Sequence, residues 1–181
     1  MVMNNIYFTG DWHLGHANIM KYSNRPFHSV GEMNDTIISN FYNTIKPGAS
    51  VYFLGDFSFD RVITEDFFIK LPKNIHFHFI YGNHDKKIMN IVKYFVDSCS
   101  GMKDIKVDEY KITLNHYAMR VWNCSHFNSW QLYGHSHGTL PPEGKQCDVG
   151  VDSWNFFPVS FEQIKEYMEK QPDNFNLIKG K

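Results

Sequence analysis

The sequence is poor in cysteine and has no long apolar run. Its three cysteines, Cys99, Cys124 and Cys147, form no Cys-x-x-Cys motif, which favours reduced thiols over a disulfide framework or a zinc knuckle. No stretch reaches the roughly 20 apolar residues that a membrane span requires, and Asn4 and Asn5 leave no room for a signal-peptide core. We therefore expect a cytoplasmic protein without a membrane partner.

Arginine is scarce as well, and charge of one sign is not in excess. Only three of the 18 basic residues are arginine, and 19 acidic residues bring the formal net charge to −1. The longest basic run is Lys86-Lys87, so the concentrated basic surface that a long nucleic acid needs is not indicated. A short oligonucleotide needs less charge and therefore remains a candidate partner. The 43% hydrophobic and 20% charged residues are typical of a compact globular protein.

No linker, repeat or low-complexity segment divides the chain, so we predict a single domain over residues 1–181. In the first half, strands alternate with helices: strands are predicted at 6–8, 51–54 and 75–81, and helices at 29–46, from Thr64 and after Asp85. In the second half, short strands at 105–107, 110–115, 131–133 and 147–151 precede a helix capped by Ser160. This order predicts an α/β (α+β) fold with mixed sheets packed face to face and helices outside.

Histidine is abundant, with ten residues, and half of these lie in short polar motifs directly after predicted strands. The motifs are Asp11-Trp12-His13, Gly55-Asp56, Gly82-Asn83-His84-Asp85, Asn115-His116 and Gly134-His135-Ser136-His137. Loops at strand ends converge in open α/β sheets, so we expect one shared site. In extended backbone, residues i and i+2 point to the same side. Asp11 and His13 are therefore expected to reach one centre, and His135 and His137 likewise.

Seven of these side chains are candidate metal ligands: Asp11, His13, Asp56, Asn83, His116, His135 and His137. Oxygen and nitrogen donors without thiolate suit transition metals better than calcium or magnesium. Seven ligands are too many for one catalytic ion, whereas two ions about 3.5–4 Å apart, bridged by a carboxylate and a hydroxide, would use them all. We expect two divalent metal ions, with manganese as the first choice and iron, zinc, nickel or cobalt as alternatives. Such a centre carries net positive charge and attracts a phosphate ester.

The ordered motifs resemble the calcineurin-like metallophosphoesterases, whose pattern is D-x-H, G-D, G-N-H-[DE], H and G-H-x-H. The flanking Asn24-Arg25-Pro26-Phe27 and Asp148-Val149-Gly150-Val151-Asp152 resemble a small bacterial and phage branch. The resemblance implies a four-layer sandwich of two mixed β-sheets flanked by helices, with the metal site at strand ends. It implies one ion held by Asp11, His13, Asp56 and His137 and a second by Asp56, Asn83, His116 and His135, with Asp56 as the bridge. His84 resembles the catalytic histidine, which binds no metal.

The predicted activity is hydrolysis of a small phosphomonoester or phosphodiester, with a nucleotide as one candidate substrate. A metal-bridging hydroxide attacks in line, and His84 acts as the general acid. Asp60 and Asp85 are both candidates for orienting His84, because the segment from Gly55 to Arg61 is shifted by one residue from the G-D-x-x-D-R-G pattern of protein phosphatases. Two alternatives remain: a nuclease or RNA-end-processing phosphatase, and a non-enzymatic metal-binding scaffold.

Four further residues are candidate substrate contacts, each with an ordinary structural role as its alternative. Arg25 is a candidate phosphate clamp because a guanidinium binds phosphate through two parallel hydrogen bonds. His16 follows the first motif and is a candidate pocket residue. Trp122 and Asn128 belong to an aromatic and polar segment, residues 122–130, that we expect to cover the metals and stack on a base. The oligomeric state stays open.

Overall fold

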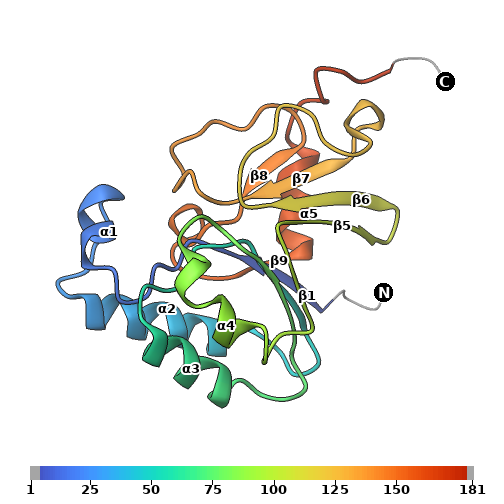
Figure 1. The fold of residues 1–181 in the computed structure, drawn as a ribbon. Coiled ribbons are helices and arrows are strands. Elements are labelled where there is room, and N and C mark those ends of the chain that lie inside the picture. The colour runs from blue at the N-terminus through green and yellow to red at the C-terminus, as the bar shows by residue number, and fades with distance from the viewer. Residues whose placement is uncertain (1–4, 179–181) are drawn as a thin grey trace.

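The computed structural model describes residues 5–178, and their strands form two sheets (Figure 1). The first sheet has the order β4-β3-β2-β1-β9. Its strands are β1 (Ile6–Thr9), β2 (Ser50–Phe53), β3 (His76–Ile80), β4 (Ser98–Ser100) and β9 (Val159–Ser160). Strands β1 to β4 run parallel to one another, and β9 is antiparallel to β1. Parallel pairing requires crossovers, which the helices of the first half supply.

The second sheet has the order β5-β6-β7-β8. Its strands are β5 (Met102–Val107), β6 (Tyr110–Asn115), β7 (Trp130–Tyr133) and β8 (Gln146–Asp148). A tight hairpin makes β5 and β6 antiparallel, whereas β6, β7 and β8 are mutually parallel. Both sheets are therefore mixed, as expected, and the carboxyl ends of β1, β2, β3, β6 and β7 meet at one edge of the molecule.

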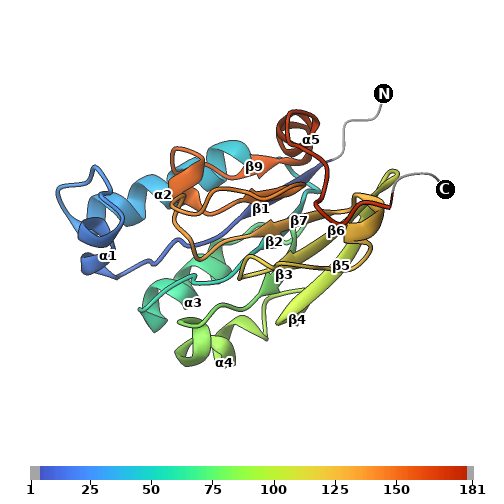
Figure 2. The same ribbon diagram turned by 90° about the horizontal axis from the view of Figure 1, so that it is seen from above.

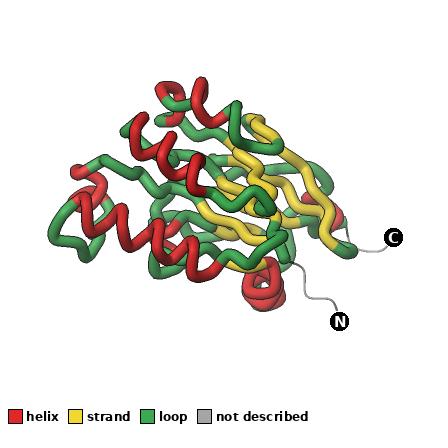
Figure 3. Tube along the Cα trace, turned by 90° about the horizontal axis from the view of Figure 1, so that it is seen from below, coloured by secondary structure: helices red, strands yellow, loops and turns green. Residues whose placement is uncertain are grey.

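Helices flank the sheets (Figures 2 and 3). They are α1 (Ala17–Tyr22), α2 (Val30–Thr44), α3 (Arg61–Lys70), α4 (Met89–Val92) and α5 (Phe161–Glu169). Apolar residues of α2, α3 and α4 pack on the outer face of the first sheet, and α5 packs into the core between the sheets. The short α1 projects at the end opposite the chain termini, near the strand ends that carry the motifs (Figure 1).

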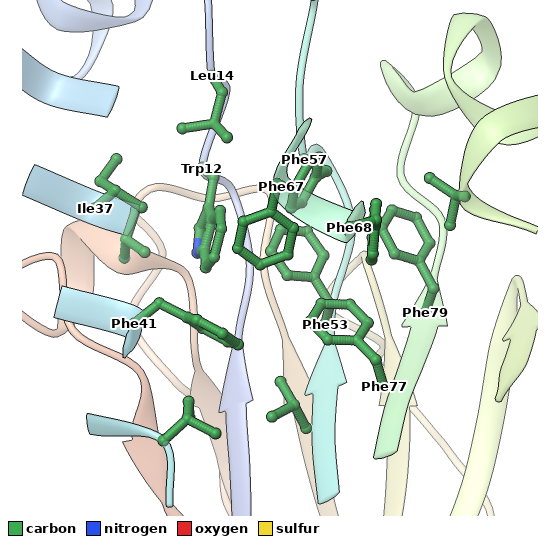
Figure 4. Packing of buried hydrophobic residues seen from close by; sticks show 14 of the residues in the cluster. Trp12, Leu14, Ile37, Phe41, Phe53, Phe57, Phe67, Phe68, Phe77 and Phe79 are labelled. Atoms are coloured by element: carbon green, nitrogen blue, oxygen red, sulfur yellow. The ribbon is translucent and has the colours of Figure 1, made fainter. Parts of the chain in front are cut away.

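Trp12, the middle residue of the first motif, lies at the centre of the helix-side core (Figure 4). Its ring packs edge-on against Phe41 and Phe53 at centroid distances of 5.4 and 5.2 Å, and its indole N–H donates to Thr9 at 2.9 Å. Complete burial of an aromatic side chain stabilises the fold by about 2–3 kcal/mol. The core thus anchors the loop that carries Asp11 and His13.

The loop that follows β6 packs against the second sheet. Two glutamines hold this loop, residues 117–124, to the sheet. Gln131 accepts the backbone N–H of Met119 at 3.1 Å and donates to the Tyr117 carbonyl at 2.9 Å. Gln146 donates to Gln131 and to the Met119 carbonyl. Because these amides are buried, they need such partners, and the loop provides them.

Most predicted elements are confirmed, with shifts at their ends. Ser160 forms the predicted capping box with Gln163 at the start of α5. The helix predicted from Thr64 begins instead at Arg61, because the Asp60 carboxylate accepts the N–H groups of residues 62 and 63 as its N-cap. The helix expected after Asp85 is a 3₁₀ turn followed by the four-residue α4. The sequence did not predict α1, β4 or β9.

Candidate metal centre

All five motifs lie at the edge where the strand ends meet. Backbone hydrogen bonds join their loops directly: the Asp11 N–H donates to Gly55 O at 2.8 Å, and the His13 N–H donates to Asp56 O at 3.0 Å. The Gly134 N–H donates to His116 O at 3.0 Å, which joins the loops of the second sheet. Short polar loops from both sheets are thereby fixed against one another.

The backbone of five candidate ligands is left-handed rather than extended. The φ angles of Asp11, His13, Asp56, His135 and His137 are 56°, 53°, 58°, 67° and 48°. Non-glycine residues rarely adopt this region, which costs on the order of 1–3 kcal/mol per residue. The argument from extended backbone is therefore wrong for these loops. Strain concentrated on this set of polar residues points to a functional site.

The candidate ligands form two groups. In the first, ligand atoms of Asp11, His13 and His137 lie within 4.8 Å of one another, and in the second those of Asp56, His116 and His135 do. Asp11 and His13 share a group, as expected. His135 and His137 do not, so the spacing rule fails for this pair. This division matches the two sets that the family resemblance implies.

Asp56 lies between the two groups. Its Oδ2 atom is 3.5 Å from His13 Nε2 in the first group and 3.5 Å from His116 Nε2 in the second. The amide oxygen of Asn83 is 3.0 Å from His116 Nε2 and so adds a potential ligand to the second group. This is the position that a carboxylate shared by two ions would occupy.

The first group contains buried polar atoms without hydrogen-bond partners among the described residues. They are Asp11 Oδ1 and both ring nitrogens of His13. Burial raises the pKa of Asp11 to about 7, although nearby histidines oppose the shift. Buried polar atoms normally have partners, and a divalent cation would supply the missing one. The donor set and these atoms fit a metal ion.

In the second group, Asp56 and His116 form a tightly coupled pair. Burial disfavours the charged form of both, but their mutual attraction outweighs it: the pKa of Asp56 falls to about 2 and that of His116 rises to about 9. His116 Nδ1 donates to the Leu54 carbonyl at 2.7 Å, so its Nε2 faces Asp56 and Asn83. His116 would hold a metal ion through Nε2, in place of a proton on that atom.

Two glycines of the motifs are required by the close approach of the carboxylates. A side chain at Gly82 would collide with Asp56 Oδ1, and one at Gly134 would collide with Asp11 Oδ2. The Asp11 carboxylate also accepts the N–H of His135 at 2.8 Å, directly after Gly134. Gly82 therefore allows the loop after β3 to approach the Asp56 carboxylate, and Gly134 allows the loop after β7 to approach the Asp11 carboxylate.

His84 lies at the open side of the site. Its Nε2 is 4.0 Å from Asp56 Oδ2, and 44% of its side chain is exposed. The ring packs against those of Phe59 and His13, at centroid distances of 5.0 and 5.6 Å. Its backbone N–H donates to Asp56 Oδ1 at 2.9 Å. The imidazole can therefore reach a molecule held at the two ligand groups.

Neither predicted carboxylate orients His84. The buried Asp85 accepts the backbone N–H groups of Asp56, Phe57 and Gly82 at 2.9, 2.8 and 2.7 Å. Burial raises its pKa, against the effect of these three bonds. Asp60 caps α3. Within residues 5–178, neither side chain hydrogen-bonds to the His84 ring, so Asp85 is a positioning residue for the Asp56 loop rather than a partner of His84.

Arg25 is not a phosphate clamp. Its side chain is fully buried, and Nε and Nη2 donate to the two carboxylate oxygens of Asp152 at 2.8 and 2.7 Å. The remaining donors bind the backbone carbonyls of Asp11 and Trp12 at 2.6 and 2.9 Å. The guanidinium has no face left for a substrate, and the prediction of a clamp is wrong.

Trp122 and Asn128 lie away from the site. Because β6 and β7 are parallel, residues 122–130 return to the amino end of β7, and this turn, gold in Figure 1, lies on the side of the chain termini. Buried Trp122 donates its indole N–H to Ser129 O at 3.2 Å. Asn128 binds Asp173 and the N–H of Asn174. Both are structural, so the predicted cover over the metals is wrong.

His16 does lie at the pocket. A cleft of about 630 Å³ is lined by ligands of both groups and by His84. His16, Ile19 and Tyr22, which lie in or next to α1, also line it, together with Thr139 and Leu140. The ring of His16 stacks on Phe59 at a centroid distance of 4.1 Å. The wall of α1, which the sequence did not predict, replaces residues 122–130 as the aromatic side of the site.

The sequence reasoning missed three further residues of the site. Asp152 accepts the Nδ1–H of His137 at 2.7 Å. Asp148 accepts the Ser136 hydroxyl at 2.6 Å and the Gly138 N–H at 3.0 Å, which fixes the last motif. Tyr117 is 3.4 Å from Asn83 Oδ1 through its hydroxyl. Asp148 and Asp152 lie in a segment that carries the family likeness, but no spacing rule marked any of the three residues.

Comparison with known proteins agrees with this geometry. Residues 5–177 match the calcineurin-like phosphoesterase family. The chain belongs to this family. An uncharacterized protein of Methanocaldococcus jannaschii is 34% identical over 94% of each chain. Membership explains why the motifs occur in this order and at the ends of these strands.

Two solved structures are similar to the phosphoesterase fold of this chain. A protein of unknown function from Aquifex aeolicus has a TM-score of 0.70 at 23% identity, over 90% of this chain and 98% of that one. A nuclease of Pseudomonas putida has a TM-score of 0.47 at 18% identity, over 74% of this chain and 62% of that one. The first likeness supports the fold. In residues 5–178, no helix is long and apolar enough to cross a membrane.

Proposed function

We propose that this phosphoesterase is a hydrolase of a small phosphomonoester or phosphodiester that uses two divalent metal ions. The observation that carries the proposal is the position of Asp56 Oδ2, 3.5 Å from a histidine nitrogen of each ligand group. Two ions that share one carboxylate fit this position. Asp11, His13 and His137 would hold the first ion, and Asn83, His116 and His135 the second.

The donor chemistry favours manganese, with iron, zinc, nickel or cobalt as alternatives, because every ligand is oxygen or imidazole nitrogen. When bound, two such ions activate a water molecule as nucleophile and withdraw charge from the phosphoryl oxygens. The protein's part is to hold its ligands in strained, fixed positions, with Asp85 securing the Asp56 loop.

His84 is proposed as the general acid. Its ring nitrogen lies 4.0 Å from Asp56 Oδ2 and faces the open cleft. An imidazole here donates a proton to the departing oxygen of an ester whose phosphoryl group lies at the ligand groups, which typically contributes about 10²–10⁴ in rate. The open side of the ring is also where an exchangeable substrate would enter.

The cleft favours a substrate with one phosphoryl group and an uncharged organic part. Among residues 5–178, its lining contains histidines, hydroxyls, apolar side chains and the Asp56 carboxylate but no lysine or arginine, so additional phosphates find no positive partner there. Tyr22, which is 73% exposed, stands 6.3 Å from the His16 ring. This aromatic wall favours a planar group, and a nucleoside monophosphate is a candidate of suitable chemistry.

The decisive experiment is a hydrolysis screen. The metal-free protein is supplied with Mn²⁺, Ni²⁺, Zn²⁺ or Mg²⁺ and assayed with p-nitrophenyl phosphate, bis-p-nitrophenyl phosphate and 2′,3′-cyclic nucleotides. Activity that depends on metal and disappears in Asp56→Asn supports the proposal. Equal background in wild type and variant with every metal would contradict it and favour a metal-binding scaffold, whereas binding that falls steeply with salt would favour a nuclease.

A further inference from the structure

The buried ion pair of Arg25 and Asp152 has no part in substrate binding, yet it joins two distant segments beside the metal centre. The residues are 127 positions apart, and two parallel hydrogen bonds of 2.8 and 2.7 Å link them. The exposed fractions of the two side chains are 0% and 7%. A buried pair with bidentate geometry is rigid, so whatever each partner contacts is fixed relative to the other.

The remaining contacts of the pair go to a single ligand group. Arg25 binds the carbonyls of Asp11 and Trp12, the two residues that precede His13. Asp152 Oδ2 accepts the Nδ1–H of His137 at 2.7 Å. A histidine that donates its Nδ1–H keeps the lone pair of Nε2 free for a cation. The pair thus controls the tautomer of His137 and holds the carbonyls of Asp11 and of Trp12, the residue before His13.

The second ligand group is held by other residues. The His116 ring is oriented by the Leu54 carbonyl at 2.7 Å, and the Asp56 loop is held by Asp85 at 2.9 Å. In the described part of the chain, neither Arg25 nor Asp152 hydrogen-bonds to Asp56 or His116. The groups that orient His116 and hold the Asp56 loop are therefore distinct from the Arg25–Asp152 pair, although the Asp11 carboxylate also accepts the His135 N–H.

We propose that Arg25 and Asp152 are positioning residues that set the affinity of the Asp11–His13–His137 position for its metal ion without setting that of the second position. The proposal rests on the two-ion centre proposed above. Two physical effects act together. Asp152 orients His137, and its negative charge neutralises the guanidinium, which would otherwise repel a cation bound beside it.

The test is a metal titration of Asp152→Asn, which keeps the shape of the side chain and removes its charge. Metal-free wild type and variant are titrated with Mn²⁺ by calorimetry, and bound ions are counted after desalting. We expect two ions in wild type. In Asp152→Asn, one dissociation constant should rise about 10–100-fold, while the other stays within about twofold. The paramagnetic resonance signal of a coupled manganese pair should give way to that of an isolated ion.

Asp97→Asn is the matched control. Asp97 likewise contacts a histidine nitrogen, His76 Nδ1 at 3.3 Å, and accepts a backbone N–H, that of Phe77 at 2.8 Å. Asp97 directly precedes β4 and lies beside the amino end of β3, away from the strand ends that carry the ligands. Both metal affinities should stay at their wild-type values in this variant.

Three results would overturn the proposal: equal weakening of both positions in Asp152→Asn, no weakening of either, or fewer than two ions in wild type. If Asp152→Asn does not fold, as judged by circular dichroism, Arg25→Lys replaces it; this variant keeps the charge and loses the bidentate bonds, and the same one-sided loss is required. Because no readout uses a substrate, a wild type that binds two ions but hydrolyses nothing contradicts the proposed function alone.

Discussion

The Asp85 carboxylate holds the backbone of Asp56 in place: its Oδ2 accepts the Asp56 N–H at 2.9 Å across 29 residues of sequence. The same carboxylate accepts the N–H groups of Phe57 and Gly82. Asp56 and Gly82 belong to different strand-end loops, so one buried side chain fixes two motifs relative to each other. This relationship explains why a residue of the G-N-H-D motif matters without touching His84.

Asp85→Asn should destabilise the fold. An amide offers one oxygen to three N–H groups, and its own N–H₂ faces one of them, so at least one buried donor loses its partner. We expect the free energy of unfolding to fall by about 2–4 kcal/mol, measured by urea denaturation of the metal-free protein. Asp66→Asn, which removes the exposed ion pair with Lys70, should change it by less than about 1 kcal/mol. Equal effects of the two substitutions would refute the role of Asp85.

His84→Ala should retain both metal ions and lose turnover, by about 10²–10⁴. The loss should be larger for alkyl esters than for p-nitrophenyl esters, because a poor leaving group depends more on protonation. Steady-state kinetics together with metal counting provides the measurement, and His28→Ala, at an exposed histidine, is the control. Loss of metal from His84→Ala would show that the residue is a ligand instead of an acid.

Metal binding should stabilise the protein markedly. The ligand loops store backbone strain, and three atoms of Asp11 and His13 lack hydrogen-bond partners within residues 5–178. An ion therefore binds the folded state and not the unfolded one. At a free concentration of 100 times the dissociation constant, each ion adds about 2.7 kcal/mol. Thermal unfolding with Mn²⁺ and with a chelator measures this effect. Asp56→Asn should lose most of the shift; identical melting temperatures of wild type under both conditions would contradict the metal centre.

Tyr22 should contribute to substrate choice if the aromatic wall stacks on a base. Adenosine 5′-monophosphate and ribose 5-phosphate both release a primary 5′ alcohol and differ at C1′, which carries the base in the first and a hydroxyl in the second. We expect wild type to favour the nucleotide in kcat/KM by roughly tenfold or more, Tyr22→Phe to keep this ratio, and Tyr22→Ala to bring it close to one. A ratio unaffected by Tyr22→Ala would place the base elsewhere.

His78 should make stability fall in mild acid. Burial, and then the charge of Lys103, lower the pKa of this half-buried histidine, which stacks on Tyr52 and contacts the Ser98 hydroxyl. The unfolded chain takes up a proton near pH 6.5 that the folded chain does not, so the contribution is present above that pH and lost below it. The decrease in unfolding free energy from pH 7 to pH 5 should be smaller in His78→Gln than in wild type. His28→Gln should leave it unchanged, and an unchanged slope in His78→Gln would contradict the pKa shift.

The predicted elements show which parts of the fold follow from local sequence patterns. The helix from Val30 to Thr44 and the capping box at Ser160 follow from side chains within a few residues of each other, and the sequence predicts them correctly. The two-residue β9 and the three-residue β4 exist because longer neighbouring strands offer them hydrogen bonds. Their own residues carry no periodic signal, so they could not be predicted locally.

The site residues likewise divide into those that local motifs predict and those whose roles depend on distant partners. The candidate ligands were found because each follows a strand in a motif of distinct chemistry. Arg25 was misassigned because its partner, Asp152, lies 127 residues away. Trp122 and Asn128 were misplaced because the direction of β7 relative to β6, which carries residues 122–130 to the far end of the sheet, is a property of the sheet and not of the segment.

The sequence by itself determined the family, the fold class and the residues that meet at the strand ends. Motif order and hydrophobic periodicity can be read directly along the chain, without knowledge of long-range contacts. Only the tertiary structure decided how the ligands divide into two groups, which carboxylates support them and which wall faces a substrate. Those outcomes depend on left-handed backbone at the ligands and on hydrogen bonds between residues far apart in the chain. Such contacts form only when the two sheets and their loops are packed together.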